Sequence, residues 1–526
     1  MAGQSITNSR SELSKRVHRF FLFVLPAVTD NNFCDVGEID CPASRMYSFV
    51  ESKSIADDLE TLIVPRTRPE VLVSFNSGEA KTLPQYLATI IVTIGGFIAG
   101  TIIAWSSPAG VALKNGAFGF PVTEGDNSWI ASIMPVGAIL GCVLTGLTVD
   151  VLGRKNVLVA VVTPCTIGWC LILWAESVMM ICIGRFILGT TCGCFTIVCP
   201  MYTAETSQKE IRGTLGTIFQ LQVVCGITLV YILGSFLTLF YLTLVCLVIP
   251  SIYLVLMCMI PESPVYHVKQ GNIEAAKRSL QSLRGSHFDI TFDIADLMEA
   301  ADRIVSEKIP FSIAMRSKAA IKGLIIGLGA MFFQQFSGVN AVIFYAASIF
   351  KDAGSSFDYN VSSIIVGAVC VVFTYLATLI IGKLGRRVLL LFSSIVMTIC
   401  TISLGTYFHF VINSYDVSSF RSIPIVSLCA FIIAFSVGFG PIPYMLMGEI
   451  FSPLIKGTAS SIVCLFNWFC AFLVTKYFST LSESFGQDVT FWAFSFLSFI
   501  GIFFVYKSVP ETKGKSLEEI QELLDS

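Results

Sequence analysis

Three amide side chains lie inside one long apolar segment of this chain, in the sequence FQQFSGVN over residues 333–340. Amides suit a neutral, polyhydroxylated ligand, because each offers two donors and an acceptor without the desolvation cost of a charge. On an unbroken helix, Gln335 and Asn340 would point to opposite sides of the stripe that holds Gln334. Gly338 lies among them, and we expect the helix to unwind there around a water-filled cavity. Hydrogen bonding between helices is the alternative explanation.

Further polar and aromatic side chains lie in other apolar segments. Residues 438–444, with the sequence GFGPIPY, place two glycines and two prolines inside one segment, which must bend there. Beside that bend, Tyr444 would present a ring face and a hydroxyl to a sugar. Asn467 and Trp468 add an amide and an indole donor, and Gln220 adds an amide from the first half of the chain. Packing is the alternative explanation for each of them taken singly.

Charged side chains gather at the ends of the apolar segments. Glu205 and Glu449 each end a segment, and each is followed seven residues later by a basic residue and a glycine. Ionised groups near hydrocarbon are costly unless they are paired. We therefore predict a gate of ion pairs that holds the two halves of the chain together, against the alternative that the cations only fix topology. The predicted gate residues are Arg154, Arg185, Glu205, Arg212, Glu262, Arg386, Arg387, Glu449 and Lys456.

The composition excludes several functions. Of the 526 residues, 54% are hydrophobic and only 13% are charged, which indicates a polytopic membrane protein, since soluble domains carry about 25% charge. A net charge of −2 gives no support for nucleic-acid binding. Four scattered histidines lack metal-ligand spacing, and no GxxxxGK[ST] phosphate loop is present. We therefore predict no enzyme activity, no cofactor and no metal, and assign the cysteines to packing.

Twelve apolar segments are long enough to span a bilayer, six on each side of a polar stretch. The spans are predicted near 87–106, 128–149, 157–175, 178–199, 214–236, 239–260, 319–349, 361–382, 388–412, 422–448, 458–481 and 489–509. The predicted domains are a disordered segment over 1–84, a six-helix bundle over 85–260, a helical linker over 261–318, a second six-helix bundle over 319–509 and a tail over 510–526. This is an all-α membrane fold.

Basic residues in the short loops predict the topology. Arg154, Arg212 and Arg386 are among many cations on one side, whereas the other side holds only Lys114, Lys351 and Arg421. Since cytoplasmic loops collect Lys and Arg, both termini and the linker are predicted to be cytoplasmic. The sequon at Asn360 then faces outward and is a glycosylation candidate, although it abuts a span. The apolar run over 20–28 is too short to span, and no small-residue cleavage site follows it, which argues against a signal peptide.

The two halves repeat three motifs at corresponding loops. Leu-Gly-Arg at 152–154 recurs at 384–386, the Glu-x6-Arg/Lys-Gly spacing from 205 recurs from 449, and Pro-Glu-Ser at 261–263 recurs as Pro-Glu-Thr at 510–512. Three matched features indicate duplication. Parallel six-span repeats are typical of transporters that rock two halves around a central site.

These motifs together resemble the sugar porter family of the major facilitator superfamily, and in particular the insect facilitated trehalose and glucose transporters. The resemblance covers residues from about 83 to 516, through the strings DVLGRK, GRF, PMYTAE, PESP, QQFSGVN, GPIP and PETKG. It implies the major facilitator fold, and it implies that Gln220, Gln334, Gln335, Asn340, Tyr444 and Trp468 line the sugar site. It also implies that the inner gate is formed by Arg154, Arg185, Glu205, Arg212, Arg386, Glu449 and Lys456.

The chain departs from that family's usual pattern at three positions. Cys370 stands where glucose facilitators usually have an amide, Tyr444 where they have a tryptophan, and Gly382 where an acidic residue precedes the second Leu-Gly-Arg. The first two changes put glucose itself in doubt and suit a disaccharide or another hexose. The third weakens the second gate.

The first span lacks the carboxylate that the family's proton symporters use. We therefore predict facilitative uniport of a hexose or trehalose across the plasma membrane by a chain that functions as a monomer in the lipid bilayer. The alternatives are a proton-coupled symporter and a sugar sensor that does not transport.

Overall fold

The computed structural model describes residues 80–208, 210–306, 315–353, 358–381, 384–452, 455–515 and 517–525. The predictions for the amino-terminal segment up to residue 79, including the apolar run over 20–28, lie outside the described residues. The backbone of the described part is almost entirely helical, as its apolar composition requires, because a spanning helix satisfies its own backbone hydrogen bonds.

Within the described residues, twelve helical spans are long and apolar enough to cross a membrane, which agrees with the predicted number and order. Those of the first half are formed by α2 (Leu83–Ala104) with α3 (Ser106–Lys114), α4 (Glu124–Leu152), α5 (Arg154–Ala160) with α6 (Val162–Leu173), α7 (Val178–Thr206), α8 (Arg212–Phe236) and α9 (Leu239–Met257). Those of the second half are formed by α14 (Lys318–Phe336) with α15 (Val339–Ala353), α16 (Tyr359–Ile380), α17 (Arg386–Ile412), α18 (Ile423–Val437) with α19 (Ile442–Ile450), α20 (Lys456–Phe485) and α21 (Gln487–Ser508).

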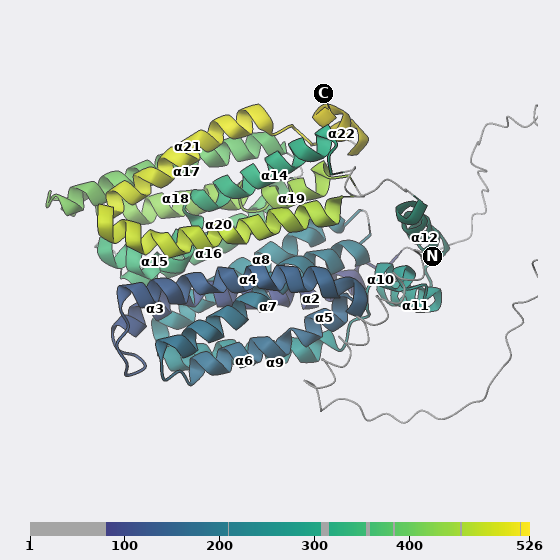
Figure 1. Ribbon diagram of the computed structural model, residues 1–526, viewed down its shortest axis with the longest axis horizontal. Coiled ribbons are helices and arrows are strands. Elements are labelled where there is room, and N and C mark those ends of the chain that lie inside the picture. The colour runs from purple at the N-terminus through teal and green to yellow at the C-terminus, as the bar shows by residue number, and fades with distance from the viewer. Residues whose placement is uncertain are drawn as a thin grey trace, which may run out of the picture. The chain divides into compact units, whose positions relative to one another are not determined.

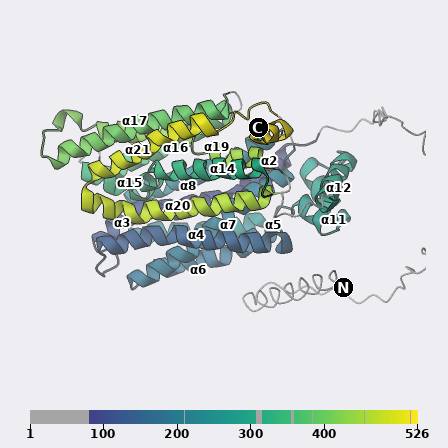
Figure 2. The same ribbon diagram turned by 45° about the horizontal axis from the view of Figure 1, so that its top comes forward.

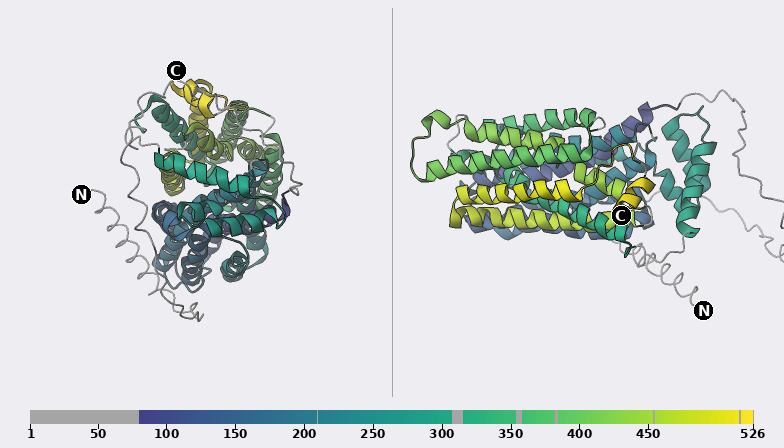
Figure 3. Two further views of the ribbon diagram at one scale, coloured as in Figure 1. Left: turned by 90° about the vertical axis from the view of Figure 1, so that its right-hand side faces the viewer. Right: turned by 90° about the horizontal axis from the view of Figure 1, so that it is seen from above.

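The spans gather into two bundles, one from each half of the chain. In the first half, α4 packs on α7 and α2 packs on α8, whereas in the second half α17 packs on α21 and α14 packs on α20. Figure 1 and the end-on view in Figure 3 show the purple and blue helices of the first half on one side and the green and yellow helices of the second half on the other. Helices α4 and α8 contact α20 and α16 across the boundary between the halves.

Glycines let α4 and α7 approach each other closely. A Cβ placed on Gly137 would overlap the carbonyl oxygen of Phe186, and one on Gly189 would overlap that of Met134. Small residues at such spacing are typical of close helix pairs in membranes. This contact fixes α4 and α7, whose last turns lie beside the candidate gate.

In the part of the chain that the structure describes, four spans each contain two consecutive α-helices. The seventh span divides at Gly338, whose φ of 94° ends α14 before α15 begins, and the tenth divides between Val437 and Ile442. Both breaks confirm the sequence prediction. The first span also divides, at Trp105, and the third divides at Val161, and neither was predicted.

Short amphipathic helices lie at one end of the bundles, as Figures 1 and 2 show. They are α10 (Pro264–Lys269), α11 (Ile273–Arg284) and α12 (Thr291–Ser306) of the linker, and α22 (Leu517–Asp525) near the carboxyl terminus. Ala276, Leu280 and Ile294 form a small separate core in the linker. We call this end of the bundles the linker end, and the opposite end the far end.

Candidate functional site

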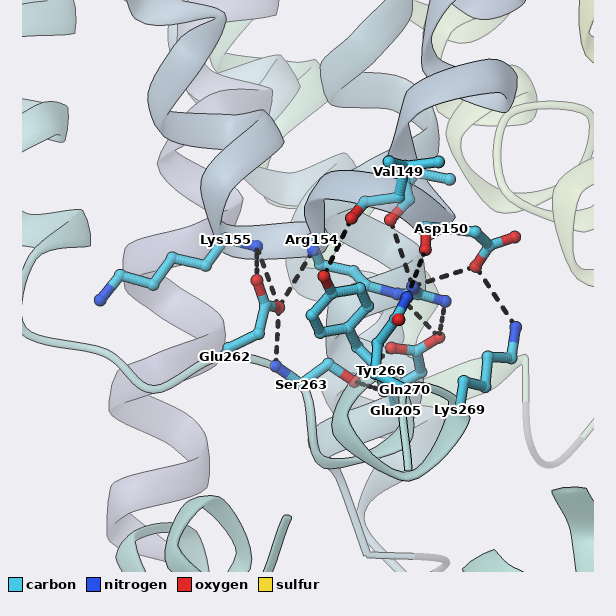
Figure 4. Close-up of polar contacts among 11 residues, drawn as sticks. Val149, Asp150, Arg154, Lys155, Glu205, Glu262, Ser263, Tyr266, Lys269 and Gln270 are labelled. Atoms are coloured by element: carbon cyan, nitrogen blue, oxygen red, sulfur yellow. Dashed lines mark hydrogen bonds and ion pairs between the residues drawn. The ribbon is translucent and has the colours of Figure 1, made fainter. Parts of the chain in front are cut away.

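Arg154 and Glu205 form an ion pair at the linker end of the first half. The Arg154 side chain is 1% exposed, and its Nη2 lies 2.8 Å from Glu205 Oε1. The second carboxylate oxygen of Glu205 accepts a hydrogen bond from the Ser263 hydroxyl. Figure 4 shows these side chains converging from α5, α7 and the start of the linker. Burial of a guanidinium is costly unless a carboxylate pairs with it. The pair therefore stabilises the packing of the last turn of α7 against α5.

The Glu262 side chain binds backbone N–H groups at the beginning of α5. Its carboxylate accepts from the N–H groups of Arg154 at 3.0 Å and Lys155 at 3.0 Å. The first N–H groups of a helix have no intrahelical partner, and the helix dipole favours an anion there. Glu262, predicted as a gate residue, therefore acts as a helix cap.

Asp150 and the linker extend this cluster in the first half. Asp150 Oδ1 lies 3.1 Å from Arg154 Nη1 and 3.3 Å from Lys269 Nζ of α10. Arg284 of α11 donates to the carbonyl oxygen of Thr206 at 2.8 Å, next to Glu205, and pairs with Asp293 at 3.1 Å. Burial lowers the pKa of Arg284, and the Asp293 carboxylate opposes that shift. The linker thus binds directly to the gate of the first half.

The second half repeats the arrangement with equivalent residues. Arg386 Nη2 lies 2.9 Å from Glu449 Oε1, and the Thr512 hydroxyl donates to the other carboxylate oxygen of Glu449 at 2.6 Å. Glu511 accepts from the N–H groups of Arg386 at 2.9 Å and Arg387 at 3.1 Å, at the start of α17. The three duplicated motifs therefore meet in space, once in each half. The hydroxyls of Ser263 and Thr512 were missed, although the repeated Pro-Glu-Ser/Thr motif held the signal.

Each ion pair lies within a single half of the chain. Arg154 and Glu205 come from α5 and α7, and Arg386 and Glu449 come from α17 and α19. The prediction that these pairs hold the two halves together is therefore wrong. Each repeated unit supplies both its own cation and its own carboxylate, so the charges are satisfied inside that unit.

Three other predicted gate cations lie near these pairs and bond to backbone carbonyls. Arg212 donates to Ser207 O at 3.2 Å, Lys456 donates to Gly448 O at 2.8 Å, and Arg387 donates to Tyr506 O. These contacts satisfy the last turns of α7, α19 and α21, whose final carbonyls have no intrahelical partner.

Arg185 lies at the far end, so its assignment to the same gate is wrong. It is 20 residues, or about 30 Å of helix, from Glu205. Its guanidinium is fully buried and donates to Ile102 O at 2.5 Å, Ser106 Oγ at 2.8 Å and Ile130 O at 3.3 Å. It also lies 5.6 Å from the centre of the Trp105 ring. Carbonyl groups, a hydroxyl and an aromatic face stabilise this cation.

Four polar side chains form a continuous relay at the break in the seventh span. Asn340 Nδ2 donates to Gln335 Oε1 at 2.5 Å, and Gln335 Nε2 donates to Asn467 Oδ1 at 2.7 Å. Asn467 Nδ2 then donates to the Tyr444 hydroxyl at 3.1 Å. The relay draws on α14, α15, α19 and α20. Gln335 and Asn340 meet because the chain unwinds at Gly338, as predicted.

Gln334 points elsewhere, which corrects the expectation that all three amides face one place. Its Nε2 donates to Phe439 O at 2.5 Å and Gly440 O at 3.2 Å, carbonyls in the break of the tenth span. Gln334 therefore stabilises the break that positions Tyr444. Its Oε1 is buried without a hydrogen-bond partner.

Tyr444, at the end of the relay, is 38% exposed. Asn467 lies on α20, which packs on α4 of the first half. Gln220 is half-buried on α8, and Trp468 is 8% exposed on α20 beside Asn467.

Asn360 and Cys370 both lie on α16. Asn360 is half-exposed in its first turn, where Asp358 accepts from its backbone N–H at 2.8 Å. Cys370 is buried with its Sγ 3.8 Å from Ser436 Oγ.

Comparison with known proteins places this arrangement in context. The model of the family described as "Sugar (and other) transporter" matches residues 87–524. The facilitated trehalose transporter Tret1 of Culex quinquefasciatus is 39% identical over 470 residues, which are 89% of this chain and 89% of that protein. The protein of the same name from Apis mellifera ligustica is 42% identical over 441 residues, covering 83% of this chain and 87% of that protein.

A solved structure of the proton:xylose symporter XylE bound to 6-bromo-6-deoxy-D-glucose superposes with a TM-score of 0.70 at 25% identity. The match covers 84% of this chain and 99% of that one. A partially occluded inward-open conformation of XylE from E. coli has a TM-score of 0.69 at 23% identity, over 82% of this chain and 99% of that one, and it shares the fold.

Proposed function

This chain belongs to the sugar transporter family, and from that premise we propose that it carries trehalose or a hexose across the plasma membrane by facilitative transport. The relay of Asn340, Gln335, Asn467 and Tyr444 is the observation that carries the proposal. A sugar needs donors and acceptors without net charge, and this relay supplies them from four helices of the second half. The relatives named as trehalose transporters support the disaccharide.

We propose that Gln335, Asn340, Asn467 and Tyr444 bind the sugar hydroxyls, with Gln220 and Trp468 completing the site. Gln220 lies on α8 of the first half, so a ligand that touches both Gln220 and the relay bridges the halves. Gln334 is assigned a positioning role, since its amide bonds to Phe439 O and Gly440 O. Bridging by a ligand couples occupancy of the site to rocking of the two bundles.

The environment of Arg185 supports uniport over proton symport. The first span, Leu83–Lys114, contains no Asp or Glu, and Arg185 is stabilised by carbonyl oxygens and the Ser106 hydroxyl. A cation satisfied by groups that do not titrate leaves no proton to be exchanged there. The named relative XylE is a proton:xylose symporter, so the comparison alone does not decide the coupling.

The gate residues are proposed to keep each bundle rigid at the linker end. Arg154–Glu205 and Arg386–Glu449 each join helices within a single half. The linker binds the first pair through Ser263, and Arg284 binds the carbonyl of the neighbouring Thr206. Rigid halves are what a rocking mechanism moves. We assign the linker end and both termini to the cytoplasm, following the distribution of Lys and Arg.

The test is uptake of radiolabelled trehalose and of glucose by purified protein in liposomes, with and without a protonophore. Uptake that equilibrates and ignores the protonophore supports uniport, whereas uptake that a proton gradient drives above equilibrium supports symport. Binding without flux or counterflow would support a sensor. Gln335→Ala is the matched variant, because it disrupts the relay, and it should raise KM while the purified protein stays folded.

A further inference from the structure

Helix α15 is kinked at Tyr345, whose φ of −121° and ψ of 16° are not helical. In a regular α-helix, the carbonyl oxygen of Ile343 accepts from the N–H of Ala347, one turn later. These are two backbone groups on either side of the kink.

Both groups are bonded to hydroxyls of the other half of the protein. The Tyr231 hydroxyl of α8 donates to Ile343 O at 2.7 Å, and the N–H of Ala347 donates to Ser107 Oγ of α3 at 3.1 Å. The Tyr231 hydroxyl donates to Ile343 O, and the Ser107 hydroxyl accepts from Ala347 N–H. These two bonds replace the bond that the two backbone groups would form with each other in a straight helix. The arrangement joins the far ends of the two halves.

The side chain of the kinked residue is held by its own half. The Tyr345 hydroxyl donates to Thr475 O of α20 at 2.9 Å, and its ring lies 5.2 Å from that of Phe478. The backbone beside the kink is therefore bound to one bundle and the Tyr345 side chain to the other. Separation of the far ends must break the first set of contacts.

Burial makes these hydrogen bonds consequential. Ser107 is 2% exposed and Tyr231 is 4% exposed, and a Cβ on Gly367 of α16 would lie 3.2 Å from the Tyr231 ring. An unpaired backbone group in such surroundings is costly, so Ile343 O and Ala347 N–H must be bonded in every populated state. Two arrangements satisfy them: the hydroxyls of the first bundle, or each other.

We propose that Tyr231 and Ser107 are positioning residues of the transport cycle, which stabilise the kinked α15 and the state in which the far ends are in contact. When the far ends separate, Ile343 O and Ala347 N–H bond to each other, α15 straightens, and the released hydroxyls bond to water. The exchange leaves no buried group unpaired in either state, as a two-state element requires. The inference rests on the proposed transport function and specifies how its far-end closure is made.

The experiment compares Tyr231→Phe with Tyr407→Phe, and Ser107→Ala with Ser107→Thr. The Tyr407 hydroxyl donates to Ala353 O at 2.8 Å at the end of the same helix, but Tyr407 belongs to the same half, so its loss does not favour either state. Initial rates of labelled sugar entry and exit are measured in proteoliposomes of known protein orientation, together with the melting temperature.

Tyr231→Phe and Ser107→Ala should lower KM on the far side by about three- to tenfold and raise it on the linker side, because both weaken the far-closed state. Tyr407→Phe should leave the ratio of the two KM values unchanged, and Ser107→Thr should keep the wild-type ratio. An unchanged ratio in both Tyr231→Phe and Ser107→Ala overturns the inference. Absence of wild-type flux would instead contradict the proposed function, which separates the two failures. Since the two hydroxyls are tested independently, one poorly folded variant does not prevent the test.

Discussion

The side chains of Gln335 and Asn467 meet in a hydrogen bond of 2.7 Å, although 132 residues separate them in the sequence. The bond links the break in the seventh span to the middle of the eleventh and continues to Asn340 and Tyr444. A site with this connectivity should respond to mutation as one unit rather than as separate contacts.

Gln335→Ala and Asn467→Ala should each weaken sugar binding by about 1 to 3 kcal/mol, because a buried partner is left unpaired. The double variant should lose less than the sum, since the two residues share one hydrogen bond. Sugar-dependent thermal shifts of the purified protein measure both effects. Gln222→Ala, a half-buried amide two residues after Gln220, is the control for general loss of an amide. Strict additivity would contradict a shared site.

Glu449→Gln should slow transport with sugar binding largely intact, because it removes the negative charge that pairs with Arg386 and one of the two oxygens that accept from Arg386 and Thr512 at the linker end. A shift of about tenfold in maximal flux is the expected scale for loss of one such contact. Thr512→Ala should show a smaller change in the same direction. Glu522→Gln, an exposed carboxylate on α22, is the control. A raised KM with unchanged maximal flux would contradict the gate assignment and would indicate that Glu449 contributes to sugar binding instead.

Arg185→Lys should lower stability by about 1 to 3 kcal/mol, because an ammonium group does not reproduce the planar fork that reaches Ile102 O, Ile130 O and Ser106 Oγ. Denaturation of the purified protein measures the loss, and Arg421→Lys, at an exposed arginine, is the control. Residual transport should stay insensitive to a protonophore. Proton-dependent flux in wild type that disappears in Arg185→Lys would contradict the assignment of Arg185 as structural.

Acidification should weaken the attachment of the linker through His267. Burial lowers the pKa of His267, and the nearby Glu262 carboxylate opposes that shift. Because its pKa is lower in the folded state, its contribution to stability is complete above about pH 6.5 and is lost as the pH falls through the lowered value. Melting temperatures of wild type and His267→Gln across pH 5 to 8 test this. A dependence in this range that is the same in both proteins would exclude His267 as its source.

Some of these features were predictable from local sequence, and others were not. Two breaks were predictable from glycine and proline, because these residues themselves set the backbone conformation. They are the break at Gly338 and the break among the glycines and prolines over 438–443. The break at Trp105 was missed, although Pro108 follows three residues later and removes the helical hydrogen bond to Ala104 O. In a duplicated chain, pairing of Arg154 with Glu205 or with Glu449 is equally consistent with the spacing, so only the tertiary structure selects the pairing within one half.

Counterflow of labelled trehalose in proteoliposomes tests the central claim most directly, with wild type compared with Gln335→Ala and Glu449→Gln under a protonophore. The account predicts transient accumulation by wild type without a proton gradient, recovery of Gln335→Ala when the sugar concentration is raised, and slow counterflow by Glu449→Gln at every concentration. Counterflow that requires a proton gradient, or that is unchanged in Gln335→Ala at low sugar, would contradict it.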